Sequence, residues 1–112
     1  MHEMTIAQSI VELAEDVALK EGAALISSID IEIGVLSGVV KEALTFAMEI
    51  TTQNTKLEKA RINYLEIAGR AYCNNCNTHF ETNDLLALCP ECHKADFKIT
   101  EGKQLKIKSL TI

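Results

Sequence analysis

Four cysteines in the second half of the chain have the spacing of a metal site. Cys73 and Cys76 form one C-x-x-C unit, and Cys89 and Cys92 form a second unit after twelve intervening residues. Two such turns placed face to face offer four thiolates at the corners of a tetrahedron, the geometry that Zn²⁺ adopts in structural sites. The spacing therefore predicts a structural zinc site with no open coordination position, rather than disulfides or a hydrolytic centre.

Two histidines lie close to these cysteines in the sequence. His79 or His93 is the alternative donor that could replace one thiolate in a four-ligand set. Since four cysteines are present, we expect both histidines instead to be solvated loop residues or hydrogen-bond donors to the ligands.

The chain starts Met-His-Glu, which is a second candidate metal site. The α-amine of Met1 and the backbone nitrogen of His2 can close one chelate ring, and that nitrogen can close another with the His2 imidazole. Glu3 offers a fourth donor, through either its backbone nitrogen or its carboxylate. A near-planar set of this kind suits Ni(II) or Cu(II) better than Zn²⁺. The pattern alone allows such a site without requiring it, because chain ends are commonly frayed and solvated.

The elements that must hold these residues follow from the pattern of apolar positions. Helices are predicted over 5–20 and 39–53, where apolar residues recur every three or four positions. Strands are predicted over 27–38, 59–69 and 104–112, where apolar and β-branched residues alternate or cluster.

Three details refine this prediction. Gly22 is expected to end the first helix in a left-handed conformation. The strand over 59–69 is apolar on both faces, which predicts burial on both. The last strand changes its alternation between Ile107 and Leu110, as a β-bulge permits, and its exposed Lys106 and Lys108 are typical of a sheet edge.

Residues 69–102 interrupt the periodic pattern with Asn, Thr, Cys and the only proline. A segment this short cannot bury enough surface to fold alone, so it needs a metal or disulfides. We therefore predict an α/β (α+β) fold: a three-stranded sheet with two helices over 1–68, completed by the last strand at 103–112. The segment 69–102 is inserted as a zinc-ribbon-like domain.

Charge, hydropathy and the motifs that are absent argue against several classes of function. The 112 residues carry a formal net charge of −5, which argues against electrostatic binding to nucleic acid or anionic lipid. No apolar stretch approaches the roughly 20 residues of a membrane span, and we expect a cytoplasmic protein. No nucleophile–base pair or phosphate-binding loop is recognisable, so we do not expect an enzyme. A zinc-ribbon module that binds nucleic acid or protein remains the alternative.

Taken in order along the chain, MHEMTIAQSI, IEIGVLSGV and the CNNC…CPECH block resemble the HypA/HybF family of hydrogenase maturation nickel metallochaperones. The resemblance implies a nickel-binding α/β domain, in which His2 is the essential Ni(II) ligand and Met1 and Glu3 complete the set. It also implies that Cys73, Cys76, Cys89 and Cys92 hold zinc.

The same resemblance implies partners. These are a GTPase nickel accessory protein and the precursor of the [NiFe]-hydrogenase large subunit, with urease as a further recipient in some relatives. Many relatives carry an acidic residue where this chain has Val35, which puts any partner contact made by that side chain in doubt. We expect a monomer, and the alternative is a dimer that exchanges the last strand between two copies.

Overall fold

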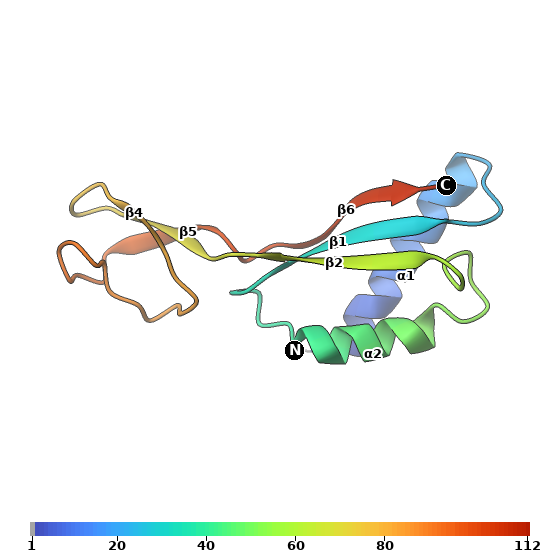
Figure 1. Ribbon diagram of the computed structural model, residues 1–112, viewed down its shortest axis with the longest axis horizontal. Helices are drawn as coiled ribbons and strands as arrows, with labels where there is room; N and C mark the ends of the chain where they lie inside the picture. The colour runs from blue at the N-terminus through green and yellow to red at the C-terminus, as the bar shows by residue number, and fades with distance from the viewer. Residues whose placement is uncertain (1) are drawn as a thin grey trace.

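The computed structural model describes residues 2–112 as two lobes of one elongated molecule, 54 Å by 25 Å by 17 Å (Figure 1). The strands form two three-stranded sheets, ordered β2-β1-β6 and β4-β3-β5. In chain order the elements are α1 (Glu3–Lys20), β1 (Ser28–Gly34), α2 (Lys41–Thr51), β2 (Arg61–Ile67), β3 (Arg70–Cys73), β4 (His79–Glu81), β5 (Phe97–Glu101) and β6 (Leu105–Thr111). The predicted fold class is confirmed. No helix in this described range is long and apolar enough to cross a membrane.

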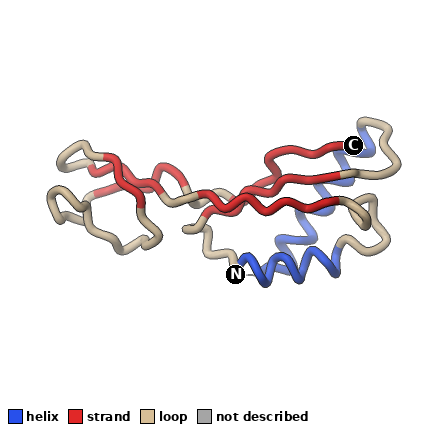
Figure 2. Tube along the Cα trace, in the orientation of Figure 1, coloured by secondary structure: helices blue, strands red, loops and turns tan. Residues whose placement is uncertain are grey.

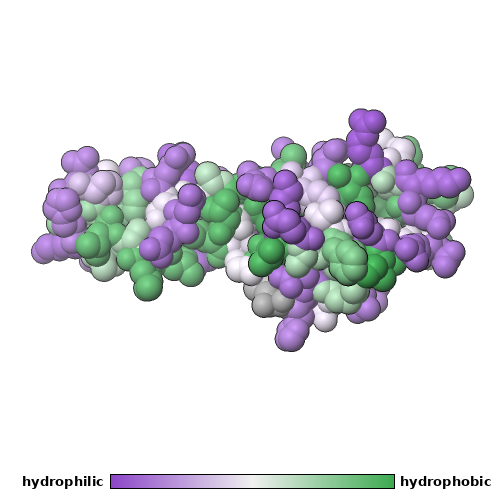
Figure 3. Space-filling view, turned by 60° about the horizontal axis from the view of Figure 1, so that its bottom comes forward, coloured by the Kyte–Doolittle hydropathy of each residue, from purple (hydrophilic) through white to green (hydrophobic). Residues whose placement is uncertain are grey.

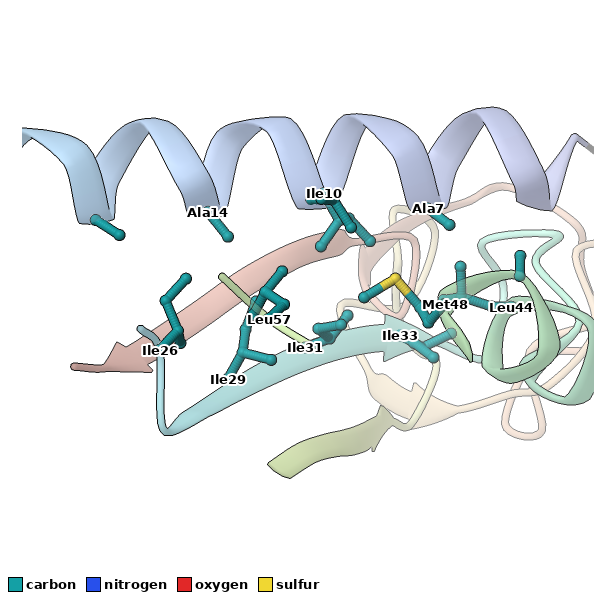
Figure 4. Close-up of a cluster of buried hydrophobic side chains, with 13 residues drawn as sticks. Ala7, Ile10, Ala14, Ile26, Ile29, Ile31, Ile33, Leu44, Met48 and Leu57 are labelled. Atoms are coloured by element: carbon teal, nitrogen blue, oxygen red, sulfur yellow. The ribbon is translucent and has the colours of Figure 1, made fainter. Parts of the chain in front are cut away.

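Both helices cover the same face of the β2-β1-β6 sheet (Figure 2). The isoleucines of β1 point into the space below α1, where they meet aliphatic side chains from both helices (Figure 4). The two helices and the β2-β1-β6 sheet form the larger lobe. Burying one large aliphatic side chain stabilises a fold by about 1.5–3 kcal/mol, so this cluster dominates the stability of that lobe. Its fully buried large members are Ile29, Ile31, Leu44, Met48 and Leu57.

The first helix differs from its prediction at the N-terminal end. It begins at Glu3 rather than at residue 5, and His2 is its N-cap residue. The His2 carbonyl accepts the backbone N–H of Ile6 at 3.1 Å, which places the second residue of the chain at the start of a formed helix. The other end is as predicted, because Gly22 has a left-handed φ of 69°.

In the larger sheet, β1 is the central strand, parallel to β2 and antiparallel to β6. The chain reaches β2 through α2, as parallel neighbours require a crossover. The predicted bulge in β6 is confirmed by a register shift opposite Asp30 and Ile31. The prediction that the strand over 59–69 is buried on both faces is wrong, because both helices cover the same face of the sheet and no residue of β2 is fully buried.

A polar contact on the outer face of this sheet ties its three strands together. The Asp30 carboxylate of β1 accepts hydrogen bonds from the Asn63 amide of β2 at 2.7 Å and from the Ser109 hydroxyl of β6 at 2.8 Å. These bonds, first that of Asn63 and then that of Ser109, hold the pKa of Asp30 below its ordinary value.

Replacing Asp30 with Asn is expected to lower the free energy of unfolding near neutral pH. A carboxyl whose pKa is lowered by folding stabilises the fold above its unfolded pKa of about 3.9, and this stabilisation is lost as the pH falls through the folded pKa. The difference between wild type and Asp30→Asn, measured by urea unfolding from pH 7 to pH 3, should therefore shrink below about pH 4. Asp16→Asn is the control, since Asp16 forms only an exposed ion pair with Lys20. A difference that does not depend on pH would contradict this role of Asp30.

The smaller lobe is an antiparallel sheet, β4-β3-β5, whose strands were not predicted from the sequence. Its own cluster of buried side chains consists of Ala71, Cys73, Phe80 and Cys89. The rings of Phe80 and Phe97 meet edge to face, with their centroids 5.5 Å apart. Two of the four buried side chains in this cluster are cysteines, so the core of this lobe and the cysteine site are one structure.

Three chain segments meet between the lobes at Gly34, Gly69 and Gly102, which we call the glycine crossing. A Cβ atom on Gly34 would lie 2.0 Å from the carbonyl oxygen of Gly102, and one on Gly102 would lie 2.6 Å from the Cα of Gly69. The Gly102 carbonyl accepts the backbone N–H of Leu36 at 2.7 Å. The lobes are thus joined by packed and hydrogen-bonded backbone rather than by a loose linker.

Replacing Gly34 with Ala is expected to destabilise the protein by several kcal/mol, because the added methyl group meets backbone that cannot move aside without breaking these contacts. The matched control is Gly22→Ala. Gly22 has open space around it, so that change costs only the strain of a left-handed residue, about 1–2 kcal/mol. Denaturant unfolding of both variants measures the difference, and equal losses would show that the crossing is not tightly packed.

Candidate metal centres

The two C-x-x-C units fold into matching turns. In each unit, the residue after the second cysteine has a left-handed backbone: Asn77 with φ 58° and His93 with φ 61°. The backbone N–H of that residue donates to the carbonyl of the first cysteine, at 2.9 Å in the Cys73 turn and 2.8 Å in the Cys89 turn. Such tight turns direct both cysteines of a unit toward the same point.

The turns bring the four sulfur atoms together. The Sγ atoms of Cys73 and Cys92 are 3.6 Å apart, those of Cys76 and Cys89 are 3.5 Å apart, and all four lie within 4.8 Å of one another. A disulfide requires about 2.05 Å, so the thiols are free. Sulfurs bound to one tetrahedral Zn²⁺ at about 2.3 Å lie about 3.8 Å apart, so the cluster fits zinc.

The four thiols differ in burial and in hydrogen bonding. Cys73 and Cys89 are completely buried, while Cys76 and Cys92 are half-buried. The hydrogen bond to Thr78 lowers the pKa of the Cys76 thiol, but burial and the neighbouring thiols outweigh it and raise that pKa to about 11. The pKa of the Cys92 thiol is lowered to about 6, chiefly by the backbone N–H of Lys94 and further by the Asn75 side chain. Hydrogen bonds to the charged form of a group favour that form.

The two neighbouring histidines are outside this cluster. Among the described residues, the group of metal-ligating side chains that the structure assembles consists of the four cysteines. His79 lies on β4, where its ring packs against Tyr72 with centroids 4.9 Å apart. His93 is held in its turn by the backbone bond to Cys89. The structure therefore leaves both histidines out of the four-sulfur cluster and gives each a local contact.

In the larger lobe, His2 is an exposed residue at the start of α1. Met1, the other residue of the predicted chelate, lies outside the described residues. Glu3 reaches across to the second helix, where its carboxylate accepts the backbone N–H of Val40 at 3.3 Å. The Glu3 backbone N–H, then that of Val40, holds the pKa of the Glu3 carboxyl below its ordinary value.

The contact between Glu3 and Val40 was not predicted from the sequence. Val40 is the N-cap residue of α2 and has no side chain that can accept a hydrogen bond from the first turn. The absence of Ser, Thr, Asp or Asn at that position was the available signal that an acceptor must come from elsewhere in the fold. As a result, the first turn of α1 and the start of α2 lie side by side.

Comparison with known proteins agrees with this fold. The profile of the family described as "Hydrogenase/urease nickel incorporation, metallochaperone, hypA" matches residues 1–112. A curated relative from Parabacteroides distasonis, named hydrogenase maturation factor HypA, is 45% identical over 112 residues, which is 100% of this chain and 97% of the relative. A relative of the same name from Geobacter metallireducens is 37% identical over 112 residues, covering 100% of this chain and 99% of its own.

Solved structures agree as well. The solution structure of the nickel metallochaperone HypA from Helicobacter pylori matches with a TM-score of 0.72 and 25% identity, covering 100% of this chain and 97% of that one. A second solution structure of a HypA protein matches with a TM-score of 0.75 and 26% identity, covering 100% and 96%. The resemblance drawn from the sequence is confirmed. The chain belongs to the HypA family, whose members are nickel metallochaperones for hydrogenase maturation and not enzymes.

Proposed function

We propose that this chain binds Ni(II) at its N-terminus and delivers it during maturation of [NiFe]-hydrogenase. The observation that carries the proposal is the position of His2, exposed at the start of a helix whose next residue is anchored to α2. An exposed ligand makes few contacts with the rest of the protein, so the metal it holds can be passed to a second protein.

The donors we assign are the α-amine of Met1, the backbone nitrogen of His2 and the His2 imidazole, with Glu3 as the fourth. The Glu3 backbone nitrogen is favoured over its carboxylate for this position. The carboxylate already accepts the Val40 N–H, whereas the Glu3 N–H takes no part in the helical hydrogen bonds and donates only to its own carboxylate. Losing that proton to a metal would leave the helical hydrogen bonds intact.

The partners follow from the same function. We propose that a GTPase nickel accessory protein and the precursor of the [NiFe]-hydrogenase large subunit exchange nickel with this chain in the cytoplasm. The family description also covers urease, which is therefore the alternative recipient.

For the smaller lobe we propose a structural zinc ion held by Cys73, Cys76, Cys89 and Cys92. The separations of the four sulfurs support this assignment. We further propose the domain division 1–68 with 103–112 for nickel, and 69–102 for zinc. Each part has its own sheet and its own cluster of buried side chains, which supports the division.

Metal analysis followed by nickel titration of the untagged chain tests both sites together. We expect one zinc per chain in the purified protein and one further equivalent of Ni(II) bound without displacing zinc. Spectra of the nickel complex should be those of a planar, nitrogen-rich site rather than of a thiolate site. Nickel that enters only by displacing zinc would contradict the proposed N-terminal site.

A further inference from the structure

The strand β6 leaves one long backbone edge of the larger sheet uncovered. In the order β2-β1-β6, its inner edge pairs with β1, and within residues 2–112 no strand pairs with its outer edge. The strand lies along the margin of the sheet for its whole length (Figure 1). Unpaired backbone groups on such an edge can accept an additional strand from another chain.

An apolar groove runs beside this edge, between β6 and α1, with a volume of about 420 Å³. Its apolar lining comes from Ile6, Ile10 and Leu13 of α1 and from Leu105 and Ile107 of β6, and Thr5, Ser9 and Lys106 also border it. The Leu13 side chain is 56% exposed, although it faces an apolar surface. In the space-filling view, hydrophobic residues are exposed on both lobes (Figure 3). The groove adjoins the free edge of β6.

The opposite face of β6 carries two lysines, which lie near acidic residues of β1. Lys106 lies there with its Nζ 3.6 Å from the Glu32 carboxylate of β1, and Lys108 interacts with Asp30. The strand that already pairs with β6 is β1, and its sequence alternates isoleucine with an acidic residue. Its isoleucines enter the core and its carboxylates face the lysines.

The outer edge of β6 offers the same two environments as its inner edge, an apolar groove on one face and lysines on the other. We infer that this edge docks an extended segment of a partner protein in which apolar and acidic residues alternate. The apolar side chains would fill the groove against Leu13 and Ile107, and the acidic ones would face Lys106 and Lys108.

Two comparisons favour this occupant and this edge. Pairing β6 with β6 of a second copy would bring the lysines of both strands together on one face, and like charges across a strand pair are destabilising. The hollow at the start of β2 is instead lined by polar residues such as Ser28, Arg61 and Asn63.

The groove starts at the first turn of α1, where Thr5 and Ile6 line it and the Ile6 N–H donates to the His2 carbonyl. A docked segment would therefore lie against the helical turn that carries the proposed nickel ligand. This last point rests on the proposed function, whereas the docking itself does not. Binding measured without nickel consequently tests the docking alone.

The test uses a fluorescent, end-capped peptide, Gly-Ser-Ile-Asp-Ile-Glu-Ile-Gly-Ser, titrated with the full-length protein. The matched control peptide carries lysine in place of its aspartate and glutamate. We expect the wild type to bind the acidic peptide at least tenfold more tightly than the basic one. Amide hydrogen exchange should slow in β6 and remain unchanged in β2.

Two variants complete the test. Lys106→Glu combined with Lys108→Glu is expected to reverse the peptide preference, and Leu13→Asp should weaken binding of the acidic peptide at least tenfold. Leu13 is largely exposed, so its replacement should preserve the fold, which circular dichroism checks. Equal affinity for both peptides, protection of β2 instead of β6, or binding unaffected by Leu13→Asp would overturn the inference. So would a wild-type dimer that Leu13→Asp dissociates, since the groove would then be filled by a second copy.

Discussion

Adding one residue before Met1, or replacing His2 with Ala, is expected to lower Ni(II) affinity by at least a hundredfold. The extension moves the α-amine away from the His2 nitrogen, and the substitution removes the imidazole, so each change opens a chelate ring. Zinc content and the unfolding transition should stay the same, because His2 is exposed and contributes to the fold only through its backbone carbonyl. Isothermal titration with Ni(II) measures the loss.

The matched control is His79→Ala, which removes an exposed imidazole at the far end of the molecule. Its nickel affinity should equal that of the wild type. If the extended chain still binds nickel as tightly as the wild type, the α-amine is not a ligand and the terminal chelate is wrong. Glu3→Gln separates the two donors of that residue, because it changes the carboxylate while keeping the backbone nitrogen.

Removing zinc is expected to unfold the smaller lobe and leave the larger one folded. Cys73→Ser takes away one ligand and also one of the four fully or nearly buried side chains in that lobe. Structural zinc contributes on the order of 10 kcal/mol to folding in small domains, far more than a cluster of this size provides. Amide exchange should show β3, β4 and β5 unprotected, while α1 and β1 keep their protection.

Replacing zinc with Co(II) gives an independent readout, since thiolate-to-cobalt absorption reports the number of sulfur ligands. Lys94→Ala is the matched control. Lys94 meets the site through its backbone, which donates to Cys92 and accepts from Cys89, so the variant should keep full zinc content. The assignment fails if Cys73→Ser keeps its zinc and the protected sheet β4-β3-β5.

The parts of this structure that were predictable are those encoded by nearby residues. The C-x-x-C turns are local, because each is closed by backbone bonds within six residues, and their spacing already indicates the four-sulfur cluster. The bulge in β6 was likewise visible as a change in alternation before Leu110. The same holds for the left-handed residue Gly22 after α1.

The parts that were missed depend on residues far apart in the sequence. Nothing near residues 59–69 shows that both helices pack on one face of the sheet, so this strand was wrongly predicted to be buried on both faces. The bond from Val40 to Glu3 spans 37 positions. The short strands β3, β4 and β5 have too few residues for a periodic signal, and they are organised around the cysteines instead.

The glycine crossing also bears on how the chain folds. To pair with β1, β6 must return across the 37 residues between Ile67 and Leu105. Closing so long a flexible loop costs about 2 kcal/mol more than closing a five-residue turn. Because Gly69 and Gly102 are in backbone contact, the ordered smaller lobe brings its two ends together and acts as a short connection. Metal capture by the cysteines during synthesis would then lower the entropic barrier to adding the last strand.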